Sequence, residues 1–402
     1  MTAPSRGPAV LSLSLDQQLA ASPSEDRVNI GDTLTRHRQY AERLDGLHVL
    51  VRSHAGASLR RLDDRLELGP RLWSYPFAVS GRWRYPAAAY RLGKELLRTT
   101  PIDVITAQDP FLTGLVGWLL ARRHGLPFNL QIHFDILDNP YWLLERPVNL
   151  ALHVLAHWLV RRADTVRVGT TREHRKLCGY GLAPERVTVA PVPVDLTRFV
   201  NPDGRLLRDA LLAGRFTRLV LWVARLVPQK DGKTLLKAAA RVVKERPQTR
   251  FVLVGQGPQE RALRAYAAKL RLGDHVHFAG AVDHQAVVAY FSACDVLALS
   301  SLYEGTALVL LEAAAAQRPA VATDVAGAED VIQEALSGFI VPIRDDAALA
   351  DRLNVILDSG RLARTMGRRA HDHVRDRFQP EVLLERLIDL WTRTASQWSV
   401  VR

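Results

Sequence analysis

The chain has 402 residues, of which 48% are hydrophobic, and a formal net charge of +12. This length is enough for two domains that each bury a core. The basic residues form no run of five or more, and no zinc-finger or RNA-binding motif accompanies them, so the composition disfavours nucleic acid as a partner and favours smaller anions, such as nucleotide diphosphates, or an anionic lipid surface.

The first 15 residues lack the basic region, apolar core and cleavage site of a signal peptide. The longest apolar runs are shorter than the ~20 residues of a membrane-spanning helix, and the two cysteines lie far apart in the sequence, as is common for thiols in a reducing compartment. We therefore expect a cytoplasmic protein that touches the inner face of a membrane at most peripherally. Two segments rich in aromatic and basic residues, 81–86 and 140–146, suit a lipid surface, but ordinary packing is the favoured interpretation.

In the first half of the chain, short runs rich in β-branched residues and leucine alternate with longer helical patterns. Strands are predicted at 9–15, 47–53, 102–107, 128–133, 165–169 and 187–192, and helices at 33–44, 86–98, 111–124 and 149–162. This alternation is typical of a parallel sheet with helices on both faces.

The pattern restarts after a stretch rich in proline and aspartate at 191–204. Strands are predicted at 218–225, 250–255, 276–280, 295–300 and 319–323, and helices at 233–245, 258–271, 284–293, 307–316 and, last, 380–395. The predicted fold is α/β, with two tandem doubly wound, Rossmann-like domains at 1–200 and 201–379. Because ligands bind beyond the carboxyl ends of such strands, we expect the domains to face each other across a cleft that suits two substrates.

Two cations follow the first strand of the second domain. Arg225 is predicted to end that strand, and Lys230 follows five residues later, before a helix. A guanidinium and an ammonium group at this place suit a diphosphate. The alternative is that both side chains are simply solvated.

The glycine pair Gly255-x-Gly257 follows the next strand. It is not a dinucleotide-binding fingerprint, because Glu260 stands where the third glycine should be. A tight turn that lets a nucleotide or the chain itself pass close to the backbone is the favoured interpretation.

The stretch LYEGTALVLLEAAAA, residues 302–316, carries Glu304 and Glu312 at the two ends of an apolar run. The residues after Glu304 would present unpaired backbone N–H groups at a helix N-terminus, which favours anions. Burying an unpaired Glu312 inside this helix would cost several kcal/mol. Its partner would be either an arginine elsewhere in the chain or a vicinal diol such as a ribose.

Two polar residues follow strands of the first domain. His133 ends a predicted strand, where a histidine either hydrogen-bonds a substrate hydroxyl, stabilises charge, or is purely structural. Asp109 has a similar position in the first domain, where it would face a second substrate, although Pro110 after it favours Asp109 as the N-cap of a helix.

The pair His153 and His157 lies four residues apart, as two zinc ligands on a helix would. The motif lacks the glutamate of HExxH, and no third ligand is evident. The apolar surroundings favour histidines packed in the core.

Together, these residues resemble the retaining glycosyltransferases of family 4, which have the GT-B fold. The resemblance rests on the pair Glu304 and Glu312 in an E-x7-E motif, the R-L-x-P-x-K segment 225–230, the Gly255-x-Gly257 turn and His133. The second half matches nearly end to end, including SACDVLALSSLYEG, PAVATDVAG and SGFIVP, whereas the first half matches loosely.

The resemblance implies catalytic roles for four residues. Arg225 and Lys230 would hold the donor diphosphate, Glu304 would approach the donor sugar, and His133 would lie beside the transferred sugar. Glu312 would bind the ribose hydroxyls. The further donor-binding positions would be Gly31, Gly255, Val282, Gly305, Thr306, Ala307, Leu308 and Val309.

The implied reaction moves a sugar from a nucleotide-diphosphate sugar to a hydroxyl of a glycan or lipid-linked acceptor, without a metal or other cofactor. The last segment, 380–402, would cross back onto the first domain. Where the family usually has glycine, this chain has Ala307 and Gln317, and its first loop offers only Gly31. Two alternatives stay open: a non-catalytic protein that binds sugar nucleotides, and a nucleotide-sugar epimerase on the same scaffold.

Overall fold

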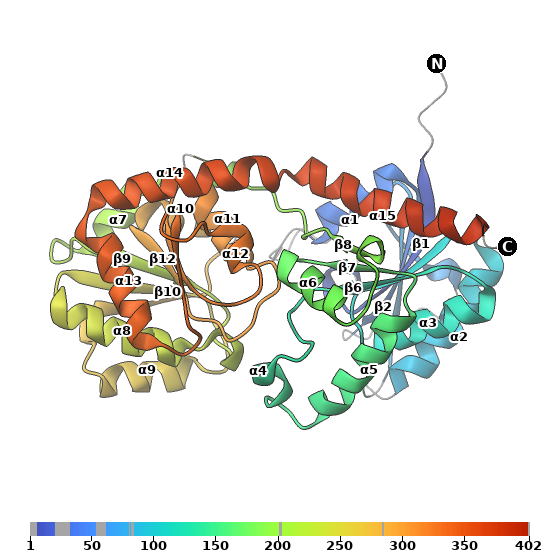
Figure 1. The fold of residues 1–402 in the computed structure, drawn as a ribbon, viewed down its shortest axis with the longest axis horizontal. Helices are drawn as coiled ribbons and strands as arrows, with labels where there is room; N and C mark the ends of the chain where they lie inside the picture. The colour runs from blue at the N-terminus through green and yellow to red at the C-terminus, as the bar shows by residue number, and fades with distance from the viewer. Residues whose placement is uncertain are drawn as a thin grey trace, which may run out of the picture. The chain divides into compact units, whose positions relative to one another are not determined.

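A computed structural model describes residues 6–20, 33–53, 62–79, 81, 84–200, 203–283 and 285–400, without the side chains of 63 and 397–400. The chain divides into two compact units. Unit 1 comprises Met1–Pro193 and Pro380–Arg402, and unit 2 comprises Val194–Gln379. Each unit is built around one sheet flanked by helices (Figure 1), which confirms the predicted α/β class. That the two domains face each other across a cleft stays a prediction.

The sheet of unit 1 has eight strands in the order β3-β4-β2-β1-β5-β6-β7-β8. The strands are β1 (Gly7–Ser14), β2 (Leu44–Ser53), β3 (Leu66–Gly69), β4 (Leu72–Ala78), β5 (Val104–Ala107), β6 (Phe128–Ile132), β7 (Thr165–Val168) and β8 (Val187–Val189). All neighbours are parallel except β3 and β4, which are antiparallel. The six predicted strands are present, and β3 and β4 are additional.

Strand β4 was missed because Pro76 lies within it, and proline weakens the case for a strand. Strand β3 pairs with β4 only over Leu72–Ser74. Pro76 therefore lies beyond the reach of β3 and is paired on one side only, opposite Val51 of β2. A proline is tolerated at such an edge position because no hydrogen bond to a second neighbour is lost.

The helices of unit 1 are α1 (Thr33–Arg43), α2 (Tyr85–Thr99), α3 (Leu112–His124), α4 (Pro140–Leu143), α5 (Val148–Arg162), α6 (Thr171–Gly179) and α15 (Pro380–Val400). Helix α15 packs on the sheet of this unit: Leu387 and Trp391 belong to a buried cluster with residues of β1 and β2. The Trp391 indole donates to Asn129 Oδ1 at 3.3 Å. The last helix therefore completes the core of unit 1.

The sheet of unit 2 is parallel, with six strands in the order β11-β10-β9-β12-β13-β14. The strands are β9 (Arg218–Val223), β10 (Thr249–Val254), β11 (Val276–Gly280), β12 (Val296–Leu299), β13 (Ala320–Thr323) and β14 (Gly338–Val341). The five predicted strands are present, and β14 is additional. The chain winds outward from β9 in one direction and from β12 in the other, so these central neighbours form the topological switch point where doubly wound sheets bind ligands.

The helices of unit 2 are α7 (Arg205–Leu212), α8 (Gly232–Glu245), α9 (Glu260–Lys269), α10 (Val287–Ala293), α11 (Leu308–Ala315), α12 (Ala328–Val331), α13 (Asp346–Asp358) and α14 (Gly360–Arg377). A buried cluster that includes Trp222, Leu236 and Phe251 fills the space between the sheet and these helices. In the described part of the chain, no helix combines the length and the apolar character needed to cross a membrane.

Both ends of α11 adopt a left-handed backbone conformation. Ala307, directly before the helix, has φ 49° and ψ 57°, and Gln317, just after it, has φ 56°. Residues with a Cβ atom pay roughly 1–2 kcal/mol for this conformation. The glycines expected by resemblance at these two positions thus have a conformational reason, and Ala307 and Gln317 carry backbone strain.

We predict that Ala307→Gly and Gln317→Gly each stabilise the fold. Relief of the left-handed strain outweighs the greater freedom of glycine in the unfolded chain, leaving a net gain of about 0.5–1 kcal/mol in the free energy of unfolding. Urea unfolding followed by circular dichroism measures the change. As a control, Ala314→Gly, inside α11, should destabilise by about 1 kcal/mol. An Ala307→Gly variant as destabilised as this control would contradict the prediction.

Candidate functional site

Two opposite charges meet at the switch point of unit 2. Lys230 closes the short turn after β9, and Glu304 lies in the loop after β12. The Lys230 Nζ atom lies 2.5 Å from Glu304 Oε1, with side-chain exposures of 16% and 7%. The Ser301 hydroxyl donates to the same carboxylate oxygen at 2.5 Å. Each charge compensates the other in surroundings where a lone ion would cost several kcal/mol.

The loops that carry this pair are joined to each other. Gln229 Nε2 donates to the carbonyl oxygen of Tyr303 at 2.8 Å. The Ser300 hydroxyl donates to the carbonyl oxygen of Lys230 at 2.9 Å and accepts from the Trp222 indole at 3.2 Å. The positions of Lys230 and Glu304 are therefore set by the backbone and not only by their own contact.

Arg225 lies beyond the end of its strand, because β9 stops at Val223. The prediction that the strand ends at Arg225 is therefore wrong, since its last residue is Val223. Its side chain is exposed, and no acidic side chain of the described residues pairs with it. An exposed guanidinium at this edge of the sheet is available to an anion.

The two glycines after β10 let neighbouring loops come together. A Cβ atom on Gly255, which has φ 129°, would lie 2.0 Å from the carbonyl oxygen of Ala224. A Cβ atom on Gly257 would lie 2.5 Å from the carbonyl oxygen of Leu226. Of the two predicted reasons for this turn, the structure favours the passage of the chain itself.

The segment before α11 is packed in a similar way. A Cβ atom on Gly327, which has φ 82°, would lie 2.6 Å from the carbonyl oxygen of Gly305. Thr306 is half-buried and Ala307 is buried, whereas Leu308 is exposed and Val309 half-buried in the first turn of α11. The first backbone N–H groups of a helix have no carbonyl partner within it, so this turn offers donors at the same edge of the sheet.

Glu312 and Val282 complete the predicted donor residues of unit 2. Glu312 lies in the second turn of α11 and is half-buried. Val282 is half-buried in the loop after β11. Lys230 and Glu304 are in direct contact, and the other predicted residues follow β9, β10, β11 or β12 at one edge of the sheet.

In unit 1, His133 directly follows β6 and is half-buried. Burial first, and then the positive charges of Arg167 and Arg36, lower the pKa of His133 to about 3. The imidazole is therefore neutral at physiological pH. It can exchange hydrogen bonds with a hydroxyl group, but it cannot supply the positive charge that was one of its predicted roles.

Arg167, in the middle of β7, was not predicted as a site residue. Its guanidinium is buried and donates to Gln131 Oε1 at 2.8 Å and to the carbonyl oxygens of Ala190 and Pro191 at 2.7 and 3.2 Å. A buried cation held by neutral acceptors keeps a positive potential beside His133. The signal in the sequence was a single arginine inside an otherwise apolar strand.

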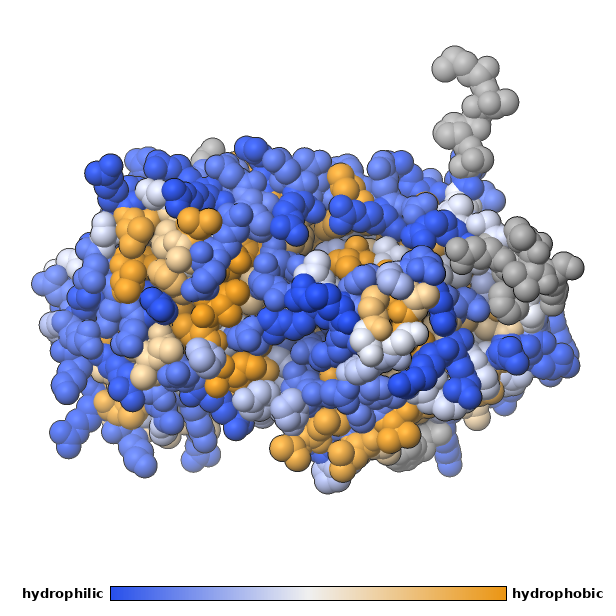
Figure 2. Space-filling model, viewed as in Figure 1, coloured by the Kyte–Doolittle hydropathy of each residue, from blue (hydrophilic) through white to orange (hydrophobic). Residues whose placement is uncertain are grey.

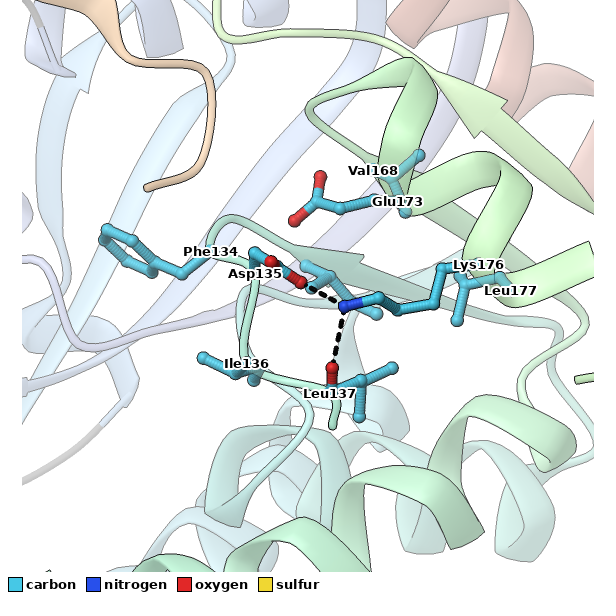
Figure 3. Close-up of a pocket in the computed structure, with 9 residues that line it drawn as sticks. Phe134, Asp135, Ile136, Leu137, Val168, Glu173, Lys176 and Leu177 are labelled. Carbon is cyan, nitrogen blue, oxygen red and sulfur yellow. Dashed lines mark hydrogen bonds and ion pairs between the residues drawn. The ribbon is translucent and has the colours of Figure 1, made fainter. Parts of the chain in front are cut away.

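A pocket lies between the ends of β6 and β7 and helix α6 (Figure 3), and its lining includes Ile132 and Phe134, the residues on either side of His133 in the chain. Lys176 crosses it to donate to Asp135 Oδ1 at 2.5 Å and to the carbonyl oxygen of Leu137 at 2.8 Å. Phe134, at the mouth, is 48% exposed. The pocket thus combines an exposed aromatic face with fixed polar groups.

Glu173, also in this pocket, is the second site residue that the sequence analysis missed. Thr170 caps α6, and Glu173 Oε2 accepts from the Gly169 N–H at 3.0 Å and from the Thr170 hydroxyl at 3.2 Å. Its Oε1 atom is buried and has no hydrogen-bond partner within the described part of the chain. The T-x-x-E spacing of a capping box was the available signal.

Burial of Glu173, reinforced by the charge of Asp135, raises the pKa of its carboxyl group to about 8. The side chain therefore carries a proton over much of the physiological range. This end of unit 1 therefore contains a protonated carboxyl group and a neutral histidine in addition to the charged Lys176–Asp135 pair.

The remaining predicted residues of unit 1 have local structural roles or lie outside the described chain. Asp109 Oδ1 accepts from the Phe111 N–H at 2.9 Å, in a turn before α3. The prediction that Pro110 opens this helix is wrong, because α3 begins at Leu112. Gly31 lies outside the described residues.

His153 and His157 are not core residues, contrary to the favoured prediction. Their side chains are 19% and 20% exposed on α5. The apolar residues around them in the sequence, Leu150 and Val154, are themselves exposed at 57% and 69%. The apolar run of α5 therefore reflects burial only in part, since Ala156, Leu159 and Val160 are buried.

We predict that Glu173→Gln stabilises the protein increasingly between pH 5 and 8. In the native state the carboxyl group holds its proton up to about pH 8, whereas the unfolded chain releases it near its ordinary value. Native stability therefore falls as the pH rises through this window, and the amide removes that loss. The expected gain at pH 8 is about 2–4 kcal/mol in the free energy of unfolding.

The measurement is chemical unfolding at a series of pH values. Glu185→Gln, at an exposed position, is the control and should show little change of its effect with pH. A Glu173→Gln effect that is independent of pH would show that the carboxyl group ionises normally in the native protein.

Both halves of the chain match families of known proteins. Residues 208–373 match the family described as glycosyl transferases group 1, and residues 34–193 match the glycosyl transferase 4-like domain. The chain is similar to D-inositol 3-phosphate glycosyltransferases: it is 30% identical to that of Streptomyces avermitilis over 380 residues, covering 91% of this chain and 79% of the relative. It is 32% identical to that of Streptomyces scabiei over 276 residues, covering 65% of this chain and 62% of the relative.

A solved structure of the Anabaena protein HepE in complex with UDP-glucose has a similar fold. The TM-score is 0.70 at 21% identity, and the match covers 98% of this chain and all of the HepE chain. With both halves matched to glycosyltransferase families and 30% identity across most of a curated relative, the chain belongs to the group 1 glycosyltransferases of family 4, which have the GT-B fold.

Proposed function

We propose that the chain transfers a glycosyl group from a nucleoside diphosphate sugar to a hydroxyl group, with retention of configuration at the anomeric carbon. The observation that carries this proposal is the Lys230–Glu304 pair at the switch point of unit 2. It lies at the same edge as the start of α11 and the exposed Arg225. The HepE structure with UDP-glucose supports a donor of this class.

The physical problem of the reaction is the leaving group. As the bond between the anomeric carbon and the phosphate oxygen breaks, the nucleoside diphosphate gains negative charge. Fixed cations and helix N–H groups stabilise that charge more in the transition state than in the ground state. The new bond forms to the acceptor oxygen, and the acceptor proton passes to the departing phosphate. Lys230 and Arg225 supply the cations, so we propose that the donor needs no metal ion or other cofactor.

Because Lys230 is already paired with Glu304, we assign Glu304 a role in the catalytic cycle. A diphosphate that enters the site shares the Lys230 ammonium group with Glu304 and weakens their contact. The carboxylate then becomes available to hydroxyl groups of the donor sugar. We assign the half-buried Glu312 to the ribose hydroxyls, because one carboxylate accepts from two neighbouring hydroxyls.

The acceptor binds in unit 1, where His133 and the protonated Glu173 offer uncharged hydrogen-bonding groups. We propose a glycan or lipid-linked hydroxyl compound. The names of the relatives add D-inositol 3-phosphate as a candidate to test, and the positive potential of Arg167 beside His133 suits a phosphate on the acceptor.

A lipid-linked acceptor fits the surface of α4 and α5. Leu144, Leu150 and Val154 are 84%, 57% and 69% exposed, and Figure 2 shows hydrophobic residues gathered over these helices. The exposed Arg161 and Arg162 end α5. Apolar side chains beside basic ones suit an anionic membrane surface. The aromatic Trp142 contributes by packing, since it is stacked on Phe111 at 5.6 Å between ring centres.

We predict that one nucleoside diphosphate among UDP, GDP and ADP stabilises the protein in thermal unfolding, with the same shift in the presence of EDTA. A ligand at a hundred times its dissociation constant adds about 2.7 kcal/mol. Lys230→Gln should weaken binding of the diphosphate and of inorganic pyrophosphate alike. Glu312→Gln should weaken only the nucleotide, by about tenfold, because it loses charge-assisted bonds to the ribose.

The 2′-deoxy form of the nucleotide is the matched control. Wild-type protein should bind it less tightly than the ribonucleotide, whereas Glu312→Gln should bind both equally. If Glu312→Gln leaves the preference for ribose intact, the ribose assignment is wrong. A shift that disappears with EDTA would overturn the metal-independent donor site.

Turnover separates glycosyl transfer from the two alternatives. A non-catalytic protein would bind the nucleotide without releasing nucleoside diphosphate from its sugar nucleotide, with any acceptor. An epimerase would convert one sugar nucleotide to another with no acceptor present. Release of nucleoside diphosphate that depends on a hydroxyl acceptor, with the product linkage read by NMR, is the result that the proposal requires.

We predict that the protein sediments with vesicles of anionic phospholipid at low salt. The double variant Leu150→Ser/Val154→Ser should bind several-fold less, because it loses apolar surface without a change of charge. Leu206→Ser in unit 2, at a leucine that is 87% exposed, is the matched control. Equal sedimentation of all three proteins would assign any binding to charge alone, and no sedimentation would overturn membrane contact.

A further inference from the structure

Three potential metal ligands converge at the surface of unit 1. His153 and His157 lie one turn apart on α5, so their side chains share a face of the helix. Asp138 comes from the segment between β6 and α4. One ligand atom from each of the three side chains lies within 4.8 Å of the other two.

The spacing of these atoms is that of a coordination site. Asp138 Oδ1 lies 3.0 Å from His153 Nε2 and 3.3 Å from His157 Nε2. Ligands held at the usual ~2.0–2.1 Å from a tetrahedral zinc ion are roughly 3.3–3.4 Å from one another. The two imidazole rings meet at 78°, so both Nε2 atoms approach the same carboxylate oxygen from different directions. Small shifts would admit an ion among the three atoms.

A second layer of contacts orients the carboxylate. The Tyr180 hydroxyl, at the end of α6, donates to Asp138 Oδ2 and so leaves Oδ1 turned toward the histidines. Partners of this kind fix the orientation of metal ligands and are typical of metal sites in proteins. Asp138 itself has a left-handed backbone, with φ 51°. The short segment is thus held in a conformation that presents its side chain to α5.

The cluster is open to solvent. The side chains of His153 and His157 are about one-fifth exposed, and that of Asp138 is 49% exposed. An ion can therefore enter from water and keep a water molecule at its fourth position. Two imidazoles and one carboxylate form the kind of mixed nitrogen and oxygen ligand set that zinc and its first-row neighbours accept.

We propose that Asp138, His153 and His157 bind one divalent transition-metal ion, with Zn²⁺ as the best match to the ligand set. The bound ion links α5 to the segment that runs from His133 to Asn139. Since that segment carries His133, Phe134 and Asp135, the ion rigidifies the pocket of unit 1. This site is separate from the donor residues of unit 2 and does not depend on the proposed reaction.

The test uses the full chain without a histidine tag, freed of metal by a chelator. Titration with Co²⁺ should give the visible absorption of a site with mixed nitrogen and oxygen ligands, saturating at one ion per chain, and Zn²⁺ should abolish it. Calorimetry with Zn²⁺ gives the affinity. His153→Gln, His157→Gln and Asp138→Asn should each weaken binding at least tenfold, and Tyr180→Phe should weaken it less.

His124→Gln, at a half-buried histidine of α3, is the matched control and should bind the metal as the wild type does. In EDTA, wild type and variants should unfold at similar temperatures, because glutamine and asparagine keep the hydrogen bonds of the cluster. Zn²⁺ should raise the unfolding temperature of the wild type and of His124→Gln, and it should raise that of the three ligand variants much less. No bound ion, or undiminished binding by the variant with all three ligands replaced, would show that the cluster is only a hydrogen-bonded network.

Discussion

The contact between Lys230 and Glu304 is the constraint around which the edge of unit 2 is arranged. Both charges are largely removed from solvent, and each would be costly there without the other. The loops after β9 and β12 must therefore stay in a fixed register, which the Gln229–Tyr303 and Ser300–Lys230 hydrogen bonds maintain. The strand order supplies the rest, because it places these two loops side by side at the switch point.

Close backbone packing then shapes the surroundings of the pair. Gly255 and Gly257 let the loop after β9 lie against the loop after β10. Gly327 lets its own backbone pass close to the carbonyl oxygen of Gly305. In the middle of this packing, Ala307 adopts a conformation that favours glycine. Strain of this kind persists only where neighbouring contacts determine the backbone. Alanine at this position thus leaves the start of α11 in place at an energetic cost.

The periodicity of the sequence predicted most strands and helices, because each depends on its own residues. It failed at β4, where Pro76 reads as a break although an edge of the sheet tolerates it. It also failed for part of α5, where the apolar run suggested a core helix but Leu150 and Val154 are exposed. No local sequence pattern could predict the contact of Lys230 with Glu304, since that contact depends on which strands become neighbours. The same reason hid Asp138, which meets His153 and His157 only after the chain has folded.

The buried polar residues of unit 1 explain why its chemistry differs from that of unit 2. Unit 2 presents full charges, Lys230 and Arg225, which suit a diphosphate. In unit 1, burial keeps His133 neutral and Glu173 protonated near physiological pH. Such groups can donate to hydroxyls and accept from them without a charge to desolvate, so binding a polyol costs less than it would beside ionised side chains. In the proposed reaction, unit 2 would offer charge to the leaving group of the donor and unit 1 would offer neutral hydrogen bonds to the acceptor.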